Sequence, residues 1–146
     1  MTEIGFYHLT RSTLAQALPQ LLTRTLAAGQ RALVLGPDAA GLEALGTALW
    51  TQPGWLPHGL ASDGDPDLQP IWLSTTAEPL NGARYLFLVD GAGIEDLKDY
   101  DRVFDLFDGK NPEAVTAARA RWKSAKDAGQ TLVYWQQTES SWQKQA

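Results

Sequence analysis

Hydrophobic residues follow two patterns along the chain, short apolar runs and longer stretches in which apolar residues recur at helical spacing. The short runs are typical of buried strands, because a strand of a parallel sheet is covered on both faces. We expect strands at 4–9, 32–36, 70–75, 83–91 and 131–137, and either a strand or a short helix at 103–109. Strands that alternate with helices predict an α/β layered domain with a mostly parallel sheet.

The helical spacing predicts three helices, at 12–29, 38–50 and about 112–128. Ser12 and Asp38 are good N-cap residues for the first two, and Pro112 suits the first turn of the third. Pro19 lies inside the first pattern, and a proline there should kink or interrupt the helix. A glycine follows the first and the third stretch, as is common where helices end.

The chain of 146 residues fits one domain with a proper core. Its 44% hydrophobic and 20% charged residues are globular values. Residues 52–69 are rich in Pro, Gly and Asp and are typical of a loop, and the segment after Thr138 is polar apart from Trp142. We therefore expect a single α/β domain over 1–137 and a polar C-terminal tail over 138–146.

Several classes of protein are excluded by composition. The chain has no cysteine, which excludes disulfides, thiolate metal sites and cysteine nucleophiles. The N-terminus has no basic region before a long apolar stretch, and no run approaches the 18 or so apolar residues of a membrane span. We expect a cytoplasmic protein that does not contact membranes.

Tests for catalytic chemistry find no convincing active site. The turn after Leu35 reads GPDAAG, which matches neither the dinucleotide fingerprint nor the P-loop. The two histidines, His8 and His58, have no metal-ligand spacing, and we expect His8 to be a structural residue. Asp90 ends a buried strand, where α/β enzymes often keep catalytic acids. A small nucleotide or phosphate-ester hydrolase is therefore the alternative function, although it lacks a recognisable phosphate-binding turn.

Charge is unevenly distributed along the chain, whose net charge is −5. The segment 90–108 carries seven acids against Lys98 and Arg102, and we expect it to form a solvated face. By contrast, four of the 12 basic residues fall within ARARWKSAK, at 118–126. The cluster is therefore local and not part of a broad basic face of the kind that nucleic-acid binding usually needs.

The third predicted helix explains how this basic cluster could bind a ligand. An apolar stripe should face the sheet and consists of Val115, Ala118, Trp122 and Ala125. Arg119, Lys123 and Lys126 form an adjacent stripe, which puts Trp122 at the seam. An aromatic wall with two charged rims suits a peptide C-terminus, with its carboxylate beside an apolar side chain. Nucleic-acid phosphate is a second possible ligand, and a third interpretation is that the cations merely complement the helix dipole and keep the surface soluble.

Six short motifs together resemble one protein family over nearly the whole chain. Their order is FYHL at 6–9, ALW at 48–50, WLPHGL at 55–60, FDG at 107–109, ARARWK at 118–123 and YWQQ at 134–137. Each motif alone is weak, but their order, spacing and total length resemble the chi subunit family of bacterial DNA polymerase III.

This resemblance implies a three-layer, Rossmann-like α/β fold without a nucleotide site, and a non-catalytic accessory subunit associated with the clamp loader. It implies no cofactor and no metal, and only indirect contact with DNA. The family binds the acidic C-terminal tail of the single-stranded DNA-binding protein. The tail-binding motif matches here at Arg119, Trp122 and Lys123, with Trp122 in place of a tyrosine familiar in some members.

Two further correspondences come from the same resemblance. Asp108 occupies a position that lines the family's pocket and is apolar in the better-known form. The family's other partner is the psi subunit of the clamp loader, where present, and the corresponding surface would include Trp50 and Trp55. An exposed tryptophan in a proline-flanked loop, as at Trp55, fits an interface anchor.

Overall fold

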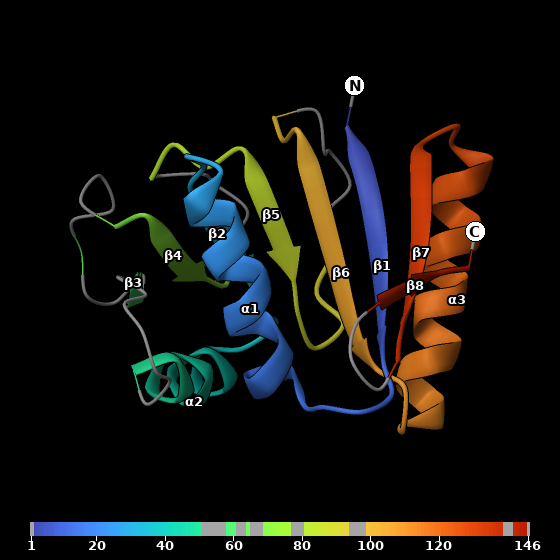
Figure 1. The fold of residues 1–146 in the computed structure, drawn as a ribbon, viewed down its shortest axis with the longest axis horizontal. Helices are drawn as coiled ribbons and strands as arrows, with labels where there is room; N and C mark the ends of the chain where they lie inside the picture. Colours follow the sequence, from blue (N-terminus) through green and yellow to red (C-terminus); the bar gives the residue numbers. More distant parts are fainter. Residues whose placement is uncertain are drawn as a thin grey trace.

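The computed structural model of the chain describes residues 2–50, 58–60, 64, 69–76, 81–93, 99–138 and 142–145, without the side chains of 50, 58 and 60. Three helices and eight strands are formed by these residues (Figure 1). In chain order they are β1 (Glu3–Leu9), α1 (Leu14–Ala27), β2 (Ala32–Leu35), α2 (Ala39–Trp50), β3 (His58–Leu60), β4 (Ile71–Ser74), β5 (Tyr85–Leu88), β6 (Arg102–Asp108), α3 (Pro112–Asp127), β7 (Thr131–Gln137) and β8 (Trp142–Lys144).

The strands form one mostly parallel sheet in the order β3-β4-β2-β5-β6-β1-β7-β8. The pairing of β7 with β8 is antiparallel, and the other neighbouring strands are parallel. Strand β1 pairs with β6 on one side and β7 on the other, so the first strand of the chain joins β7 and β8 to the rest of the sheet.

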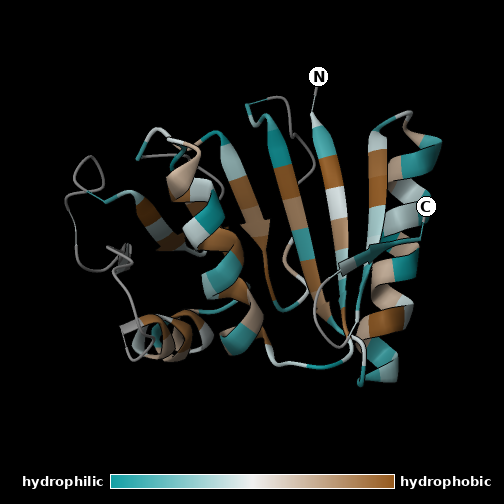
Figure 2. Cartoon of the chain, viewed as in Figure 1, coloured by the Kyte–Doolittle hydropathy of each residue, from teal (hydrophilic) through white to brown (hydrophobic). Residues whose placement is uncertain are grey.

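Helices cover both faces of the sheet, which gives the three layers expected from the sequence. Leucines of α1 and α2 pack on one face in a core that includes Leu22, Leu45 and Phe87. On the other face, α3 packs on a second core that includes Phe6 and Leu86. Figure 2 shows that hydrophobic residues dominate several strands, whereas much of α3 is hydrophilic. The α/β prediction is confirmed.

The structure decides one open prediction and differs from two others. Residues 102–108 form a strand and not a short helix. The N-cap of α1 is Thr13, whose N–H donates to Gln16 Oε1 at 2.9 Å, while the Ser12 hydroxyl accepts from Gln137 Nε2 at 2.7 Å. Helix α1 also continues through Pro19 without interruption.

Two short edge strands were not expected. Strand β3 lies in the segment that its Pro, Gly and Asp residues mark as a loop, and it pairs with β4. Strand β8 lies in the segment predicted to be a polar tail, and it pairs with β7. Among the described residues, no helix is long and apolar enough to cross a membrane.

Candidate peptide-binding site

Helix α3 carries the basic cluster, and local signals fix its start. Asn111 is the N-cap, and its Oδ1 accepts from the N–H groups of Glu113 and Ala114 at 3.0 and 3.4 Å. Pro112 occupies the first turn, where its missing N–H leaves no helical hydrogen bond unmade. The predicted helix is therefore confirmed with nearly the expected bounds.

The apolar stripe of α3 faces the sheet as predicted. Ala118 is 1% exposed and closes the contact with the second core, against which Val115, Trp122 and Ala125 pack while partly exposed. The small side chain at 118 lets the helix approach the strands closely. The neighbouring residues Arg119 and Lys123 are consequently turned to the exposed side of the helix.

Arg121, one of the four cations of the cluster, forms an ion pair with a buried carboxylate. Arg121 Nε and Nη2 donate to the two carboxylate oxygens of Asp105 on β6 at 2.7 and 2.9 Å. Asp105 is 2% exposed, and burial raises the pKa of its carboxyl while Arg121 acts in the opposite direction. The prediction that the acids of 90–108 form a solvated face is therefore wrong for Asp105, which shares its face of β6 with the buried Val103 and Phe107.

Trp122 lies beside the exposed stripe that contains Arg119 and Lys123 and is fixed by aromatic contacts. Its ring meets Phe6 of β1 edge to face, with ring centroids 5.3 Å apart, and meets Tyr134 of β7 in the same way at 5.6 Å. The two strand residues are direct neighbours in the β1–β7 register. A partly exposed aromatic wall, flanked on one helix by Arg119 and Lys123, can accept an apolar side chain and a carboxylate together.

Sequence reasoning missed the polar pair at the edge of this wall. His8 Nδ1 lies 2.8 Å from the hydroxyl of Tyr134, and the His8 ring packs against Phe107 with centroids 4.9 Å apart. Burial lowers the pKa of His8, a backbone hydrogen bond with Gly109 raises it, and the charge of Arg119 lowers it further. Arg119 also lowers the pKa of Tyr134, which burial raises. His8, Phe107 and Tyr134 come from β1, β6 and β7. Only the register of these strands brings the three side chains together, and no single motif reveals that register.

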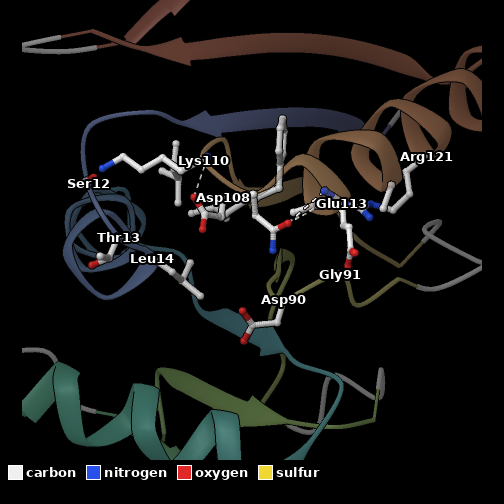
Figure 3. Close-up of a pocket in the computed structure, with 15 residues that line it drawn as sticks. Ser12, Thr13, Leu14, Asp90, Gly91, Asp108, Lys110, Glu113 and Arg121 are labelled. Atoms are coloured by element: carbon white, nitrogen blue, oxygen red, sulfur yellow. Dashed lines mark hydrogen bonds between the residues drawn. The ribbon is translucent and has the colours of Figure 1, made fainter.

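Asp108 is not brought together with the cations. Successive side chains of a strand point to opposite faces, so Asp108 and Phe107 project from opposite sides of β6. The carboxylate of Asp108 accepts from the Lys110 N–H at 2.9 Å (Figure 3). This contact shapes the turn into α3, and Asp108 lines a separate cavity of about 560 Å³, whose described lining residues do not include Arg119, Trp122 or Lys123.

That cavity lies at the carboxyl ends of β1, β5 and β6, and its charged lining residues are three acids and two cations, Lys110 and Arg121. In Figure 3 the side chains of Asp90, Asp108 and Glu113 lie around it, and Arg121 reaches one end. Asp90 adopts φ 53°, and its pKa is raised first by burial and then by the nearby charge of Asp38. No cluster of three metal-ligating side chains occurs among the described residues.

The tryptophans predicted to bind a partner subunit cannot be placed. Trp50 is the last residue of α2, but its side chain and the whole of Trp55 lie outside the described residues. The partner surface therefore stays a prediction from the sequence.

Comparison with known proteins identifies similar chains. A family model described as "DNA polymerase III chi subunit, HolC" matches residues 1–133. A protein of Rickettsia prowazekii (strain Madrid E), named "Probable DNA polymerase III subunit chi", is 28% identical over 109 residues, which cover 71% of this chain. The chain spans 66% of that relative's length, slightly less than two thirds.

Proposed function

The chain belongs to the DNA polymerase III chi subunit family, and from that premise we propose that it is a non-catalytic accessory subunit that tethers the polymerase to single-stranded DNA-binding protein. The tether is the acidic C-terminal tail of that protein, which binds on α3 at Arg119, Trp122 and Lys123. The chain contacts DNA mainly through this partner. Where a psi subunit is present, it links the chain to the clamp loader through the surface around Trp50 and Trp55.

The observation that carries this proposal is the division of roles among neighbouring side chains of α3. Arg121 is held by Asp105, while Arg119 and Lys123 are exposed in one stripe beside the partly buried Trp122. A ligand with a terminal carboxylate beside an apolar side chain matches this arrangement, because the carboxylate can pair with a cation while the apolar group covers the indole ring. Further acids along the tail favour the same basic surface.

Calorimetric titration tests the proposal. The ligand is a peptide of the last ten or so residues of the cognate single-stranded DNA-binding protein. We expect wild type to bind at micromolar affinity, about −8 kcal/mol. Arg119→Ala and Lys123→Ala should each weaken binding at least about tenfold, because a hydrogen bond to a charged group contributes roughly 1.5–3 kcal/mol.

Lys126→Ala is the matched control, since it removes the same charge from the next turn of the same helix. A peptide whose C-terminus is amidated provides a second control, because it keeps the sequence and loses the terminal carboxylate. If Lys126→Ala weakens binding as much as Arg119→Ala, the cluster acts only as a diffuse positive surface. If wild type binds no tail peptide, the proposed function is wrong.

A further inference from the structure

The hydrogen bond between His8 and Tyr134 is a polar feature of the candidate site that carboxylate recognition by Arg119 does not explain. His8 lies on β1, Tyr134 on β7, and they are 126 positions apart in the chain. The His8 ring packs on Phe107 and meets the Tyr134 ring edge to face, with centroids 6.0 Å apart. Tyr134 in turn contacts Trp122, so the imidazole is one aromatic ring away from the proposed binding surface.

The geometry indicates which nitrogen carries the proton. The hydrogen bond between His8 and the Gly109 backbone favours the protonated ring, so the ring nitrogen is the donor there. A β-carbon built on Gly109 would collide with Cδ2 and Nε2 of His8, which places the Nε2 side of the ring against this glycine. The neutral ring then carries its proton on Nε2, and Nδ1 accepts the hydrogen of the Tyr134 hydroxyl.

The surroundings of His8 favour the neutral ring in the free protein. Burial is the main cause that lowers the pKa of His8, and the charge of Arg119 on α3 acts in the same direction. From β7 the titratable neighbour is Tyr134. From β6 and its turn the neighbours are the ring of Phe107 and the backbone of Gly109, while the carboxylate of Asp108 is bound to the Lys110 N–H.

We propose that His8 takes up a proton when an acidic peptide C-terminus binds at Arg119, and that this makes binding tighter as the pH falls from about 8 to about 6. This inference rests on the proposed function. A bound carboxylate offsets the positive field of Arg119 and adds negative charge near the imidazole, both of which favour the imidazolium. Protonation at Nδ1 makes that nitrogen a donor to the Tyr134 oxygen, and the hydroxyl keeps its hydrogen and turns it toward the peptide.

Proton uptake and peptide binding are reciprocal under this scheme, because coupling between two sites changes both affinities by the same factor. The peptide's own carboxyl groups do not contribute in this range, since their pKa values lie near 4. We expect the dissociation constant to fall about fivefold from about pH 8 to about pH 6, at the lower end of the coupling that linked sites show.

The test is calorimetry with the N-acetylated tail peptide at both pH values, in two buffers of different ionisation enthalpy. For wild type we expect tighter binding at the lower pH and net proton uptake. For His8→Gln, which cannot titrate, both effects should disappear while binding at the higher pH is retained. His58→Gln is the matched control, because the chain has two histidines and β3, which begins at His58, lies at the opposite end of the sheet.

A second measurement does not depend on the variant being folded. The pKa of the His8 ring, followed by NMR in wild type with and without peptide, should rise on binding. Tail binding with no pH dependence, no proton uptake and no change in this pKa would overturn the proposal while leaving the proposed function in place. Absence of tail binding at both pH values would instead overturn the proposed function, and this proposal with it.

Discussion

Two arginines of α3, only two positions apart, have different roles. Arg119 is exposed beside Trp122, whereas the guanidinium of Arg121 is hydrogen-bonded at two points to the buried carboxylate of Asp105. In the sequence, both arginines belong to the basic cluster at 118–126. The strand alternation that buries Asp105 among Val103 and Phe107 decides which arginine is available to a ligand.

Replacing Arg121 should therefore cost stability and not tail recognition. For Arg121→Met we expect a loss of about 3–5 kcal/mol in the free energy of unfolding at neutral pH, because a buried carboxylate is left without its partner. Without the guanidinium the pKa of Asp105 rises further, so the protonated folded form is favoured. The lost stability should return partly as the pH falls toward that raised pKa. Urea unfolding followed by tryptophan fluorescence measures both effects.

The double variant Asp105→Leu with Arg121→Met is the control for this prediction. Removing both partners takes away the unpaired charge, so most of the lost stability should be regained. A loss below about 1 kcal/mol in the single variant, with no dependence on pH, would show that the ion pair does not hold α3 to the sheet.

At the scale of elements, how well the sequence predicted structure depended on the strength of the local pattern. The strand at 85–88 was predicted from its continuous apolar run, and the helix at 112–127 from its capping signals and apolar spacing. Strand β3 could not be predicted, since its three residues lie among turn-forming ones and pairing with β4 decides their conformation. Pro19 does not interrupt α1, because burial of its neighbours Leu18 and Leu22 outweighs the missing backbone donor.

Some residues of the candidate site could be predicted from a local pattern, and others could not. Arg119, Trp122 and Lys123 share one helix, so their relative positions follow from helical spacing and could be predicted. His8 and Tyr134 come from different strands, and their contact depends on the β1–β7 register, which no pattern within either segment encodes. The resemblance predicted Asp108 in the pocket, but its carboxylate accepts from the Lys110 N–H and closes a turn.

Strand β8 lies in a segment that was predicted to be a polar tail, and we expect its tryptophan to contribute to stability. Trp142 meets the buried Tyr7 edge to face, with ring centroids 5.1 Å apart. Trp142→Ala should lower the free energy of unfolding by about 1–2 kcal/mol, less than for a fully buried tryptophan because this one is partly exposed. Urea unfolding measures the change. The control is Gln143→Ala, at an exposed position of the same strand, which should change the free energy of unfolding by less than about 0.5 kcal/mol. Equal effects of the two substitutions would mean that the strand contributes through its backbone alone.

At the scale of the whole molecule, the distribution of charge is consistent with the proposed adaptor function. The chain has a net charge of −5, yet α3 presents exposed cations. A surface of this kind attracts an acidic peptide locally while the rest of the molecule repels a polyanion. Acidity of the chain as a whole and local basicity of one helix are therefore compatible.

Bare single-stranded DNA should bind weakly as a consequence. We expect a dissociation constant of about 100 µM or weaker for an oligothymidine at physiological salt, in the range of non-specific binding or beyond. Fluorescence anisotropy with a labelled oligonucleotide measures it, and the tail peptide serves as the positive control. Low-micromolar affinity that falls steeply with salt would favour direct nucleic-acid binding instead.

The central position of β1 also determines when the site can exist during synthesis. Its two partner strands, β6 and β7, begin at residues 102 and 131, so the ribosome must deliver most of the chain before the first strand can take its place. Pairings between such distant segments form late and slowly. Because Trp122 of α3 packs on Phe6 of β1 and Tyr134 of β7, a nascent or truncated chain cannot hold the proposed binding surface in place. The tail of the partner protein would then select finished molecules over unfinished ones.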